Sequence, residues 1–241
     1  MELTILGCDG SYAGPGGSCT GYLLRSATTS IWLDTGPGTL GAVQQHVALA
    51  DLDAIVVSHE HPDHCLELPV VRNALKYVLE IEGVPVITTG GVRRLVDHIS
   101  EGAEPTFTWD VVADGDRRTV GDIDLAFART DHPVETLAVR AEQAGRAIAY
   151  TADTGSRFSF DAFGAPVDLA LCEATLPPER QGTFQHLTAA EAGALAREAG
   201  AEHLLLTHLT PSSDAARSRA EAATTYDGLI SSAVPGDTHE V

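Results

Sequence analysis

The sequence predicts one layered domain of mixed α/β class. Short apolar runs, typical of buried strands, recur along the chain, and several are followed by segments with helical spacing of apolar residues. A length of 241 residues with 44% hydrophobic residues suits a folded domain with a substantial core. The sequence contains no short-period repeat, low-complexity tract or linker. We therefore expect a single domain over residues 1–241.

Strands open the chain, separated by segments rich in glycine, serine and proline. They are expected at Glu2–Leu6, Gly21–Ser26, Ser30–Thr35 and Asp53–Ser58. Residues 7–21 form a long Gly/Ser/Pro loop, and the segment "DTGPGTL" ends the third strand and starts a helix near Thr39. The continuous apolar run of the fourth strand indicates that it is buried on both faces.

Helical spacing follows over Leu66–Leu79. The apolar residues at this spacing are Leu68, Val71, Leu75, Val78 and Leu79. The segment "VPVITTG" predicts a strand over residues 84–90, and a helix is expected over Gly91–Ile99.

The second half repeats this alternation. Residues 119–151 have a strand-like pattern with turns at His132–Pro133 and Ala144–Gly145, and Val167–Leu171 is a further buried strand. The helix that follows has signals at both ends: Thr188 is the N-cap, Glu191 completes a capping box, and Gly200 ends the helix. A strand in "EHLLLTHL" and a helix over Ser213–Thr224 complete the pattern.

The segment "SHEHPDH" has the strongest chemical signal in the chain. It places His59, His61, Asp63 and His64 directly after an apolar run. Imidazole and carboxylate groups are good ligands for divalent metals such as zinc. One short segment could serve two neighbouring ions, with the first two histidines on one and Asp63 and His64 on the other. A solvated polar turn is the alternative, and so many ligand-type residues in so few positions argue against it.

A two-metal hydrolytic site needs ligands from other segments as well. His132, Asp153 and His208 each follow an apolar run, in "LAFARTDH", "RAIAYTAD" and "HLLLTH". Rigid strands fix the geometry of residues at their ends, so these three residues are the candidates that complete the site.

These motifs, taken in order, resemble the signature of the metallo-β-lactamase superfamily. "WLDTGPG" is similar to its first motif, in which Asp34 supports the site without binding metal. The resemblance implies an αββα sandwich with two divalent ions at one edge of its sheets, most readily zinc, with manganese or iron as alternatives. It also implies the ligand sets: His59, His61 and His132 for one ion, Asp63, His64 and His208 for the other, and Asp153 as the bridge.

Within the superfamily, the chain resembles the ribonuclease Z-like branch. The loop "LGCDGSYAGPGGSCTGYLL" and the segment "HLTAAEAGALAREAGAEHLLLTHLTP" carry this resemblance, and "CEATL" is similar to the "HEAT" motif. Two features depart from it: Cys172 stands at the histidine of that motif, and the span from His132 to Asp153 has no room for the arm that grips tRNA. The chain is closest to short members associated with cyclic-nucleotide phosphodiester hydrolysis.

The resemblance implies a binuclear metal-dependent hydrolase, a phosphodiesterase for small phosphodiesters such as cyclic nucleotides. A hydroxide between the two metals would attack phosphorus, with Asp63 orienting it. His186 would stabilise the phosphoryl group or protonate the leaving oxygen, just before the capped helix that starts near Ala189. A ribonuclease Z-type endonuclease, a thioester or lactone hydrolase, and a non-enzymatic metal-binding domain are the alternatives.

Composition bears on partners and location. The net charge of −19 and the absence of a basic run argue against binding long nucleic acids, although a metal site can still accept one phosphate group. No apolar run approaches the length of a membrane helix, and "MELTILGCDGS" reads as a strand and turn, not a signal peptide. We expect a cytoplasmic protein with a small phosphodiester substrate, no membrane contact and, by analogy with relatives, a homodimeric state.

Overall fold

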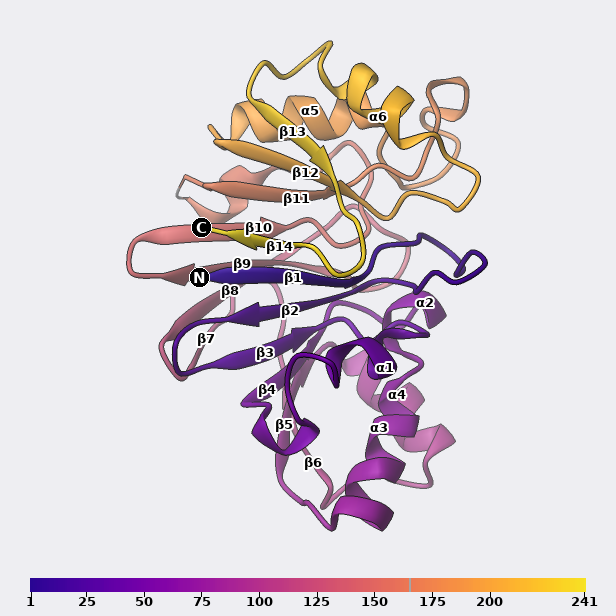
Figure 1. The fold of residues 1–241 in the computed structure, drawn as a ribbon, viewed down its shortest axis with the longest axis vertical. Coiled ribbons are helices and arrows are strands. Elements are labelled where there is room, and N and C mark those ends of the chain that lie inside the picture. The colour runs from indigo at the N-terminus through magenta and orange to yellow at the C-terminus, as the bar shows by residue number, and fades with distance from the viewer. Residues whose placement is uncertain (165) are drawn as a thin grey trace.

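The computed structural model describes residues 1–164 and 166–241, which form four layers, helix–sheet–sheet–helix (Figure 1). The first seven-stranded sheet contains, by chain order, β1 (Glu2–Gly7), β2 (Gly21–Arg25), β3 (Ser30–Leu33), β4 (Ala54–Val57), β5 (Val84–Thr88), β6 (Phe107–Val111) and β14 (Thr238–Glu240). The second contains β7 (Arg117–Val120), β8 (Ile123–Arg129), β9 (Leu137–Gln143), β10 (Arg146–Tyr150), β11 (Leu169–Glu173), β12 (His203–Thr207) and β13 (Leu229–Ser232).

Both sheets combine antiparallel and parallel strands. The spatial orders are β14-β1-β2-β3-β4-β5-β6 and β13-β12-β11-β10-β9-β8-β7. Strands β3 to β6 are parallel to one another, as are β10 to β13, whereas β7 to β10 are antiparallel neighbours. Parallel strands end at the same edge of a sheet, so the residues that follow β10, β11 and β12 lie close together.

Helices cover the outer face of each sheet (Figure 1). The first sheet is covered by α1 (Thr39–Val43), α2 (Pro62–Cys65), α3 (Leu68–Ala74) and α4 (Gly90–Ile99), and the second by α5 (Ala189–Glu198) and α6 (Ala215–Ala222). Helical turns of 3₁₀ type occur at Leu49–Asp51, Phe160–Phe163 and Pro178–Arg180, and a π-helical turn occurs at Leu75–Leu79. None of the helices in the described ranges combines the length and apolarity that crossing a bilayer requires.

Three apolar clusters follow from the alternation of side chains along the strands. In β3, Ile31 and Leu33 point between the two sheets, whereas Trp32 points to the helices on the outer face. The cluster between the sheets also receives Tyr150 and Leu171 from the second sheet. This arrangement confirms the expected αββα sandwich.

The expected strands and helices are present, with a few differences. Strands β6, β13 and β14 were not expected, because they lie at or near sheet edges and carry mixed, partly exposed side chains with no clear apolar run. Of the apolar residues at helical spacing over Leu66–Leu79, Leu68, Val71 and Leu75 are buried, whereas Val78 and Leu79 are 76% and 44% exposed. They lie in the π-helical turn Leu75–Leu79, whose wider spacing rotates them away from the buried face of α3.

Candidate metal centre

The candidate metal ligands meet at one edge of the two sheets. "SHEHPDH" follows β4, while His132, Asp153 and His208 follow β8, β10 and β12. Their ligand atoms form two groups, within each of which every atom lies within 4.8 Å of the others: His59, His61, His132 and Asp153 in one, and Asp63, His64 and His208 in the other. A third group with the same spacing joins Asp153 and His208 to His186. The structure therefore brings together all the residues that the sequence singled out as ligands.

Asp153 stands between the two groups and faces both. Its Oδ2 lies 3.6 Å from Nε2 of His59 and 3.8 Å from Nε2 of His132. Its Oδ1 lies 3.2 Å from Nε2 of His64 and 3.4 Å from Nε2 of His208. One carboxylate thus presents one oxygen to each group, which is the arrangement that a bridging ligand requires.

The donor atoms are spaced as metal ligands are. Nε2 of His132 lies 3.1 Å from Nδ1 of His61, and Nε2 of His64 lies 3.2 Å from Nε2 of His208. Ligands at 2.0–2.1 Å from a tetrahedral ion lie about 3.3 Å from one another, so these pairs fit around a cation. Nε2 of His59 and Oδ1 of Asp153 are buried without a hydrogen-bond partner among the described residues. Divalent cations would satisfy these atoms, so the residues fit such ions.

Asp34 supports the centre from a buried position next to His64. It is fully buried, and its Oδ2 accepts hydrogen bonds from Nδ1–H of His64 at 2.8 Å, from the Tyr150 hydroxyl at 2.9 Å and from the Ser58 hydroxyl at 2.9 Å. Its Oδ1 accepts from the Ser58 backbone N–H at 2.7 Å. The carboxylate therefore fixes the tautomer of His64 and directs Nε2 of that ring into the centre. It is not part of either ligand group.

Two more histidines are oriented in the same way. Nδ1–H of His132 donates to the Gln185 carbonyl at 3.1 Å, and Nδ1–H of His208 donates to the Thr175 hydroxyl at 2.7 Å. Each ring then turns Nε2 toward the centre. His61 is the exception, because Nδ1 of its ring is the atom that faces His132.

The pKa shifts divide the candidate ligand histidines. Burial alone would lower the pKa of His64, but Asp153 and Asp34 raise it well above its ordinary value, so this ring must lose a proton to bind a metal. Burial lowers the pKa of His132, and burial together with the nearby charge of His64 lowers the pKa of His59 well below its ordinary value. Both imidazoles are therefore neutral, which is the form that binds metals. Burial alone would raise the pKa of Asp153, but His208 and His64 lower it well below the usual range. This carboxylate remains ionised.

Strained backbone gathers around the centre. Asp34, Ala152 and His208 have φ angles of 56°, 50° and 54°, in the left-handed region that residues other than glycine rarely adopt. Asp34 and His208 directly follow β3 and β12, and Ala152 lies two residues after the end of β10. Such strain clusters at functional sites, where the surrounding contacts enforce it.

The glycine-rich loop of residues 7–21 packs onto the centre. The Ser11 backbone N–H donates to Oδ2 of Asp63 at 2.7 Å, and Ser11 itself has a left-handed φ of 67°. Gly10 lies so close to His208 that a Cβ atom would come within 2.4 Å of its carbonyl oxygen. The close approach requires glycine at this position, so the loop contacts the metal centre as well as connecting β1 to β2.

His186 is held by a buried carboxylate to which sequence analysis assigned no role. Nδ1–H of His186 donates to Oε1 of Glu173 at 2.9 Å, and Glu173 also accepts from the Thr154 N–H at 2.7 Å and the Thr175 hydroxyl at 2.6 Å. Burial alone would lower the pKa of His186, but the Glu173 carboxylate raises it to about 9. The imidazole is therefore protonated near neutral pH and can donate a proton.

Cys172 does not take part in this network. Along β11, Leu169 and Leu171 point between the sheets, whereas Ala170 and Cys172 point into the apolar cluster under α5. By the same alternation, Glu173 lies on the side of the centre. The strand alternation was the signal in the sequence that could have identified Glu173 as the functional member of "CEATL".

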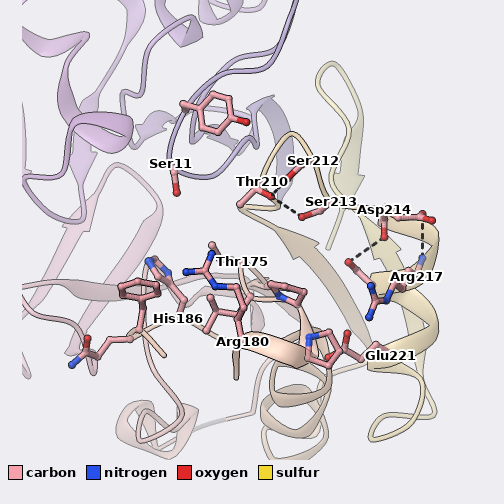
Figure 2. A pocket seen from close by; sticks show the side chains of 18 of the residues that line it. Ser11, Thr175, Arg180, His186, Thr210, Ser212, Ser213, Asp214, Arg217 and Glu221 are labelled. Carbon is pink, nitrogen blue, oxygen red and sulfur yellow. Dashed lines mark hydrogen bonds between the residues drawn. The ribbon is translucent and has the colours of Figure 1, made fainter. Parts of the chain in front are cut away.

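A cavity of about 690 Å³ opens beside the centre (Figure 2). Its wall includes His61 and His132 from the first ligand group, together with His186. Ser11 lies across the cavity from His186 and Arg180 in Figure 2. A substrate in this cavity would contact both the candidate ligands and the protonated imidazole.

Comparison with known proteins agrees with this geometry. The model of the beta-lactamase superfamily domain matches residues 29–209. The chain is 30% identical over 239 residues to probable metallo-hydrolase YhfI of Bacillus subtilis (strain 168), covering 98% of both proteins. It is 25% identical over 275 residues to ribonuclease Z of Mycobacterium bovis (strain BCG / Pasteur 1173P2), covering 100% of this chain and 98% of the relative. The crystal structure of the metallo-beta-lactamase fold protein YhfI matches with a TM-score of 0.91 at 27% identity, over 99% of this chain and 98% of that one.

Proposed function

The chain belongs to the ribonuclease Z-like branch of the metallo-β-lactamase superfamily, and on this premise we propose that it is a phosphodiesterase for small phosphodiesters such as cyclic nucleotides. The proposal rests mainly on Asp153, whose two oxygens face two separate groups of candidate ligands. Such a pair of sites is typical of two-metal hydrolases. A structural metal site is normally closed and holds one ion.

Each group would hold one divalent ion, with Asp153 shared between them. When bound, the ions would supply a hydroxide near neutral pH and neutralise the charge that develops on the phosphoryl oxygens. The Ser11 N–H donates to Oδ2 of Asp63 at 2.7 Å, and the same oxygen lies 3.1 Å from Nε2 of His208, so this carboxylate is fixed for orienting the nucleophile. We expect elemental analysis of metal-reconstituted protein to give two ions per chain. One ion or none would refute this part of the proposal.

His186 would protonate the oxygen that leaves phosphorus. Its Nδ1–H is held by Glu173, which leaves the Nε2–H free to donate, and its side chain lines the cavity. Glu173 stabilises the charged imidazole, and the product oxygen would take the proton as the bond to phosphorus breaks. This places the leaving group on the side of the cavity formed by residues 177–186.

Two features favour a small substrate over tRNA. The 21 positions from His132 to Asp153 are taken up by β9, β10 and the turns beside them, so no arm projects between these residues. The net charge of −19 would repel a long polyanion, whereas a cavity beside metal ions can accept a single phosphate group. A small phosphodiester therefore suits this protein better than an RNA chain.

A substrate panel on the metal-loaded protein tests the proposal. The panel contains cyclic AMP, bis(p-nitrophenyl) phosphate, a 3′-extended tRNA precursor, a thioester and a lactone. We expect the phosphodiesters to be cleaved fastest, with the Asp153→Asn protein as the inactive control for contaminating enzymes. Faster cleavage of the tRNA precursor would favour the endonuclease. Rapid hydrolysis of the thioester or lactone alone would favour a carbonyl substrate, and no turnover with any substrate would favour a metal-binding domain.

A further inference from the structure

Exposed aromatic side chains gather at the cavity beside the metal centre. Of the large hydrophobic residues exposed in the described ranges, three are aromatic: Tyr12, Tyr77 and Phe184, at 57%, 66% and 57% exposure. Two of them, Tyr12 and Phe184, line this cavity. Aromatic rings are usually buried because they carry a large apolar surface. Two exposed rings in one cavity therefore indicate a surface that a ligand covers.

Both rings are anchored to the metal centre through the backbone. Tyr12 follows Ser11, whose N–H donates to Asp63 at 2.7 Å. Phe184 precedes Gln185, whose carbonyl accepts from His132 at 3.1 Å. Ser11 and the wall that carries Arg180 and His186 lie on opposite sides of the cavity in Figure 2. Tyr12 and Phe184 therefore belong to two different segments that line this cavity, and each lies within one residue of a hydrogen bond to the centre.

The wall that carries Phe184 is braced from several sides. Glu179 forms an ion pair with Arg217 of α6, and the Gln181 side chain donates to Glu191 of α5 at 2.9 Å. The Arg180 guanidinium lies over the Phe184 ring, 5.1 Å from its centroid, and makes no ion pair with any described residue. A cation over an aromatic ring holds that ring in place and leaves positive charge in the cavity.

We propose that Tyr12 and Phe184 bind the base of a nucleotide phosphodiester by stacking, and that they make the cavity selective for nucleotides over phosphodiesters without a base. This inference rests on the proposed phosphodiesterase function. A nucleobase has flat faces that stack on aromatic side chains regardless of its sequence identity. The cavity wall also includes Ser212, Ser213 and Asp214, whose polar groups suit the edges of a base or a ribose.

The test compares two substrates that differ only in the base. Cyclic AMP is the first, and the 3′,5′-cyclic phosphate of methyl riboside, which has the same ring and phosphate, is the second. Stacking on an aromatic side chain, at 1–3 kcal/mol per base, corresponds to a factor of about 5 to 140. We expect Phe184→Ala and Tyr12→Ala each to lower kcat/KM for cyclic AMP by a factor in this range, mainly through KM. The rate for the methyl riboside compound should change less than about 2-fold.

Controls separate stacking from a general loss of structure. Phe184→Trp keeps a stacking surface and should retain selectivity, whereas Phe184→Leu keeps bulk without a ring and should lose it. Tyr77→Ala removes the exposed ring that lies outside the cavity and should leave both substrates unaffected. Calorimetric titration gives a second readout, in which AMP should bind the Phe184→Ala protein more weakly while inorganic phosphate binds it as it binds the parent.

The outcomes distinguish this inference from the proposed function. If the parent protein cleaves both cyclic phosphates equally well, or if the ring variants keep the parent ratio of rates and the parent affinity for AMP, the phosphodiesterase function stands and the stacking site is refuted. If the parent protein cleaves no phosphodiester, the proposed function fails and the inference that rests on it falls with it.

Discussion

Replacing Asp34 with asparagine tests the support of the metal centre. The carboxylate accepts four hydrogen bonds, three at Oδ2 and one at Oδ1, in a fully buried position. Asparagine has a single acceptor oxygen, so in either orientation its amide group faces a donor. In the less damaging orientation only the Ser58 N–H loses its acceptor, and an unpaired buried donor costs about 1–3 kcal/mol. Loss of the charge also weakens the remaining bonds, and we expect the free energy of unfolding to fall by about 2–4 kcal/mol.

Urea unfolding in the presence of a chelator, followed by circular dichroism, measures this loss without a contribution from bound metal. Because Asp34 orients His64, metal affinity should also weaken by about 10- to 100-fold, measured by competition with a chelating dye. Asp51→Asn, at an exposed aspartate, is the matched control for the change in charge. A free energy of unfolding within about 0.5 kcal/mol of the parent, together with unchanged metal affinity, would refute this account of Asp34.

Four further predictions concern catalysis. Asp153→Ala should lose both metal occupancy and activity, and retention of two tightly bound ions in elemental analysis would show that Asp153 does not bridge. His186→Ala should keep its metals while kcat falls by about 10²–10⁴-fold, and a parent rate would remove its role as acid. Glu173→Gln removes the charge that raises the pKa of His186 to about 9. Catalysis needs the protonated imidazole of His186, which is lost as pH rises, so the alkaline limb of the kcat–pH profile should move to lower pH. An alkaline limb at the parent pH would contradict the pairing of His186 with Glu173. Under the same metal and salt, kcat/KM should be higher for cyclic AMP than for a 3′-extended tRNA precursor, and the reverse order would overturn the assignment.

The positions of the candidate ligands could be predicted because each directly follows an apolar run. His132, Asp153 and His208 sit at the ends of strands that the sequence marks clearly, and strand ends that share an edge bring such residues together. Sequence spacing could not show that the two oxygens of Asp153 face different groups, since that depends on how the two sheets pack. The resemblance, not the pattern, pointed to the supporting role of Asp34.

The residues and the strand that could not be predicted from the sequence share physical reasons. Glu173 is the last residue of the buried strand β11, where a single carboxylate looks like the end of an apolar run. The Gln185 carbonyl that orients His132 is a backbone group. Because every residue has a backbone carbonyl, no residue type in the sequence marks this contact. Strand β13 pairs with β12 at a sheet edge, but its side chains are partly exposed and show no alternation. In each case, the role of the residue or strand depends on a partner that is not adjacent in the sequence.

The metal centre joins segments that are distant in the chain. Asp63 and His208 are 145 positions apart, and their side chains lie 3.1 Å from each other. An ion held between them would act as a reversible cross-link that closes a loop over most of the protein, much as a disulfide does. Because these contacts join the two sheets, we expect them to form late in folding. Bound metal should then slow unfolding while refolding keeps its rate, which stopped-flow measurements with and without chelator would test. Metal supply would then set how long each folded molecule persists, and a chelator would shorten the lifetime of the protein as well as stop its turnover.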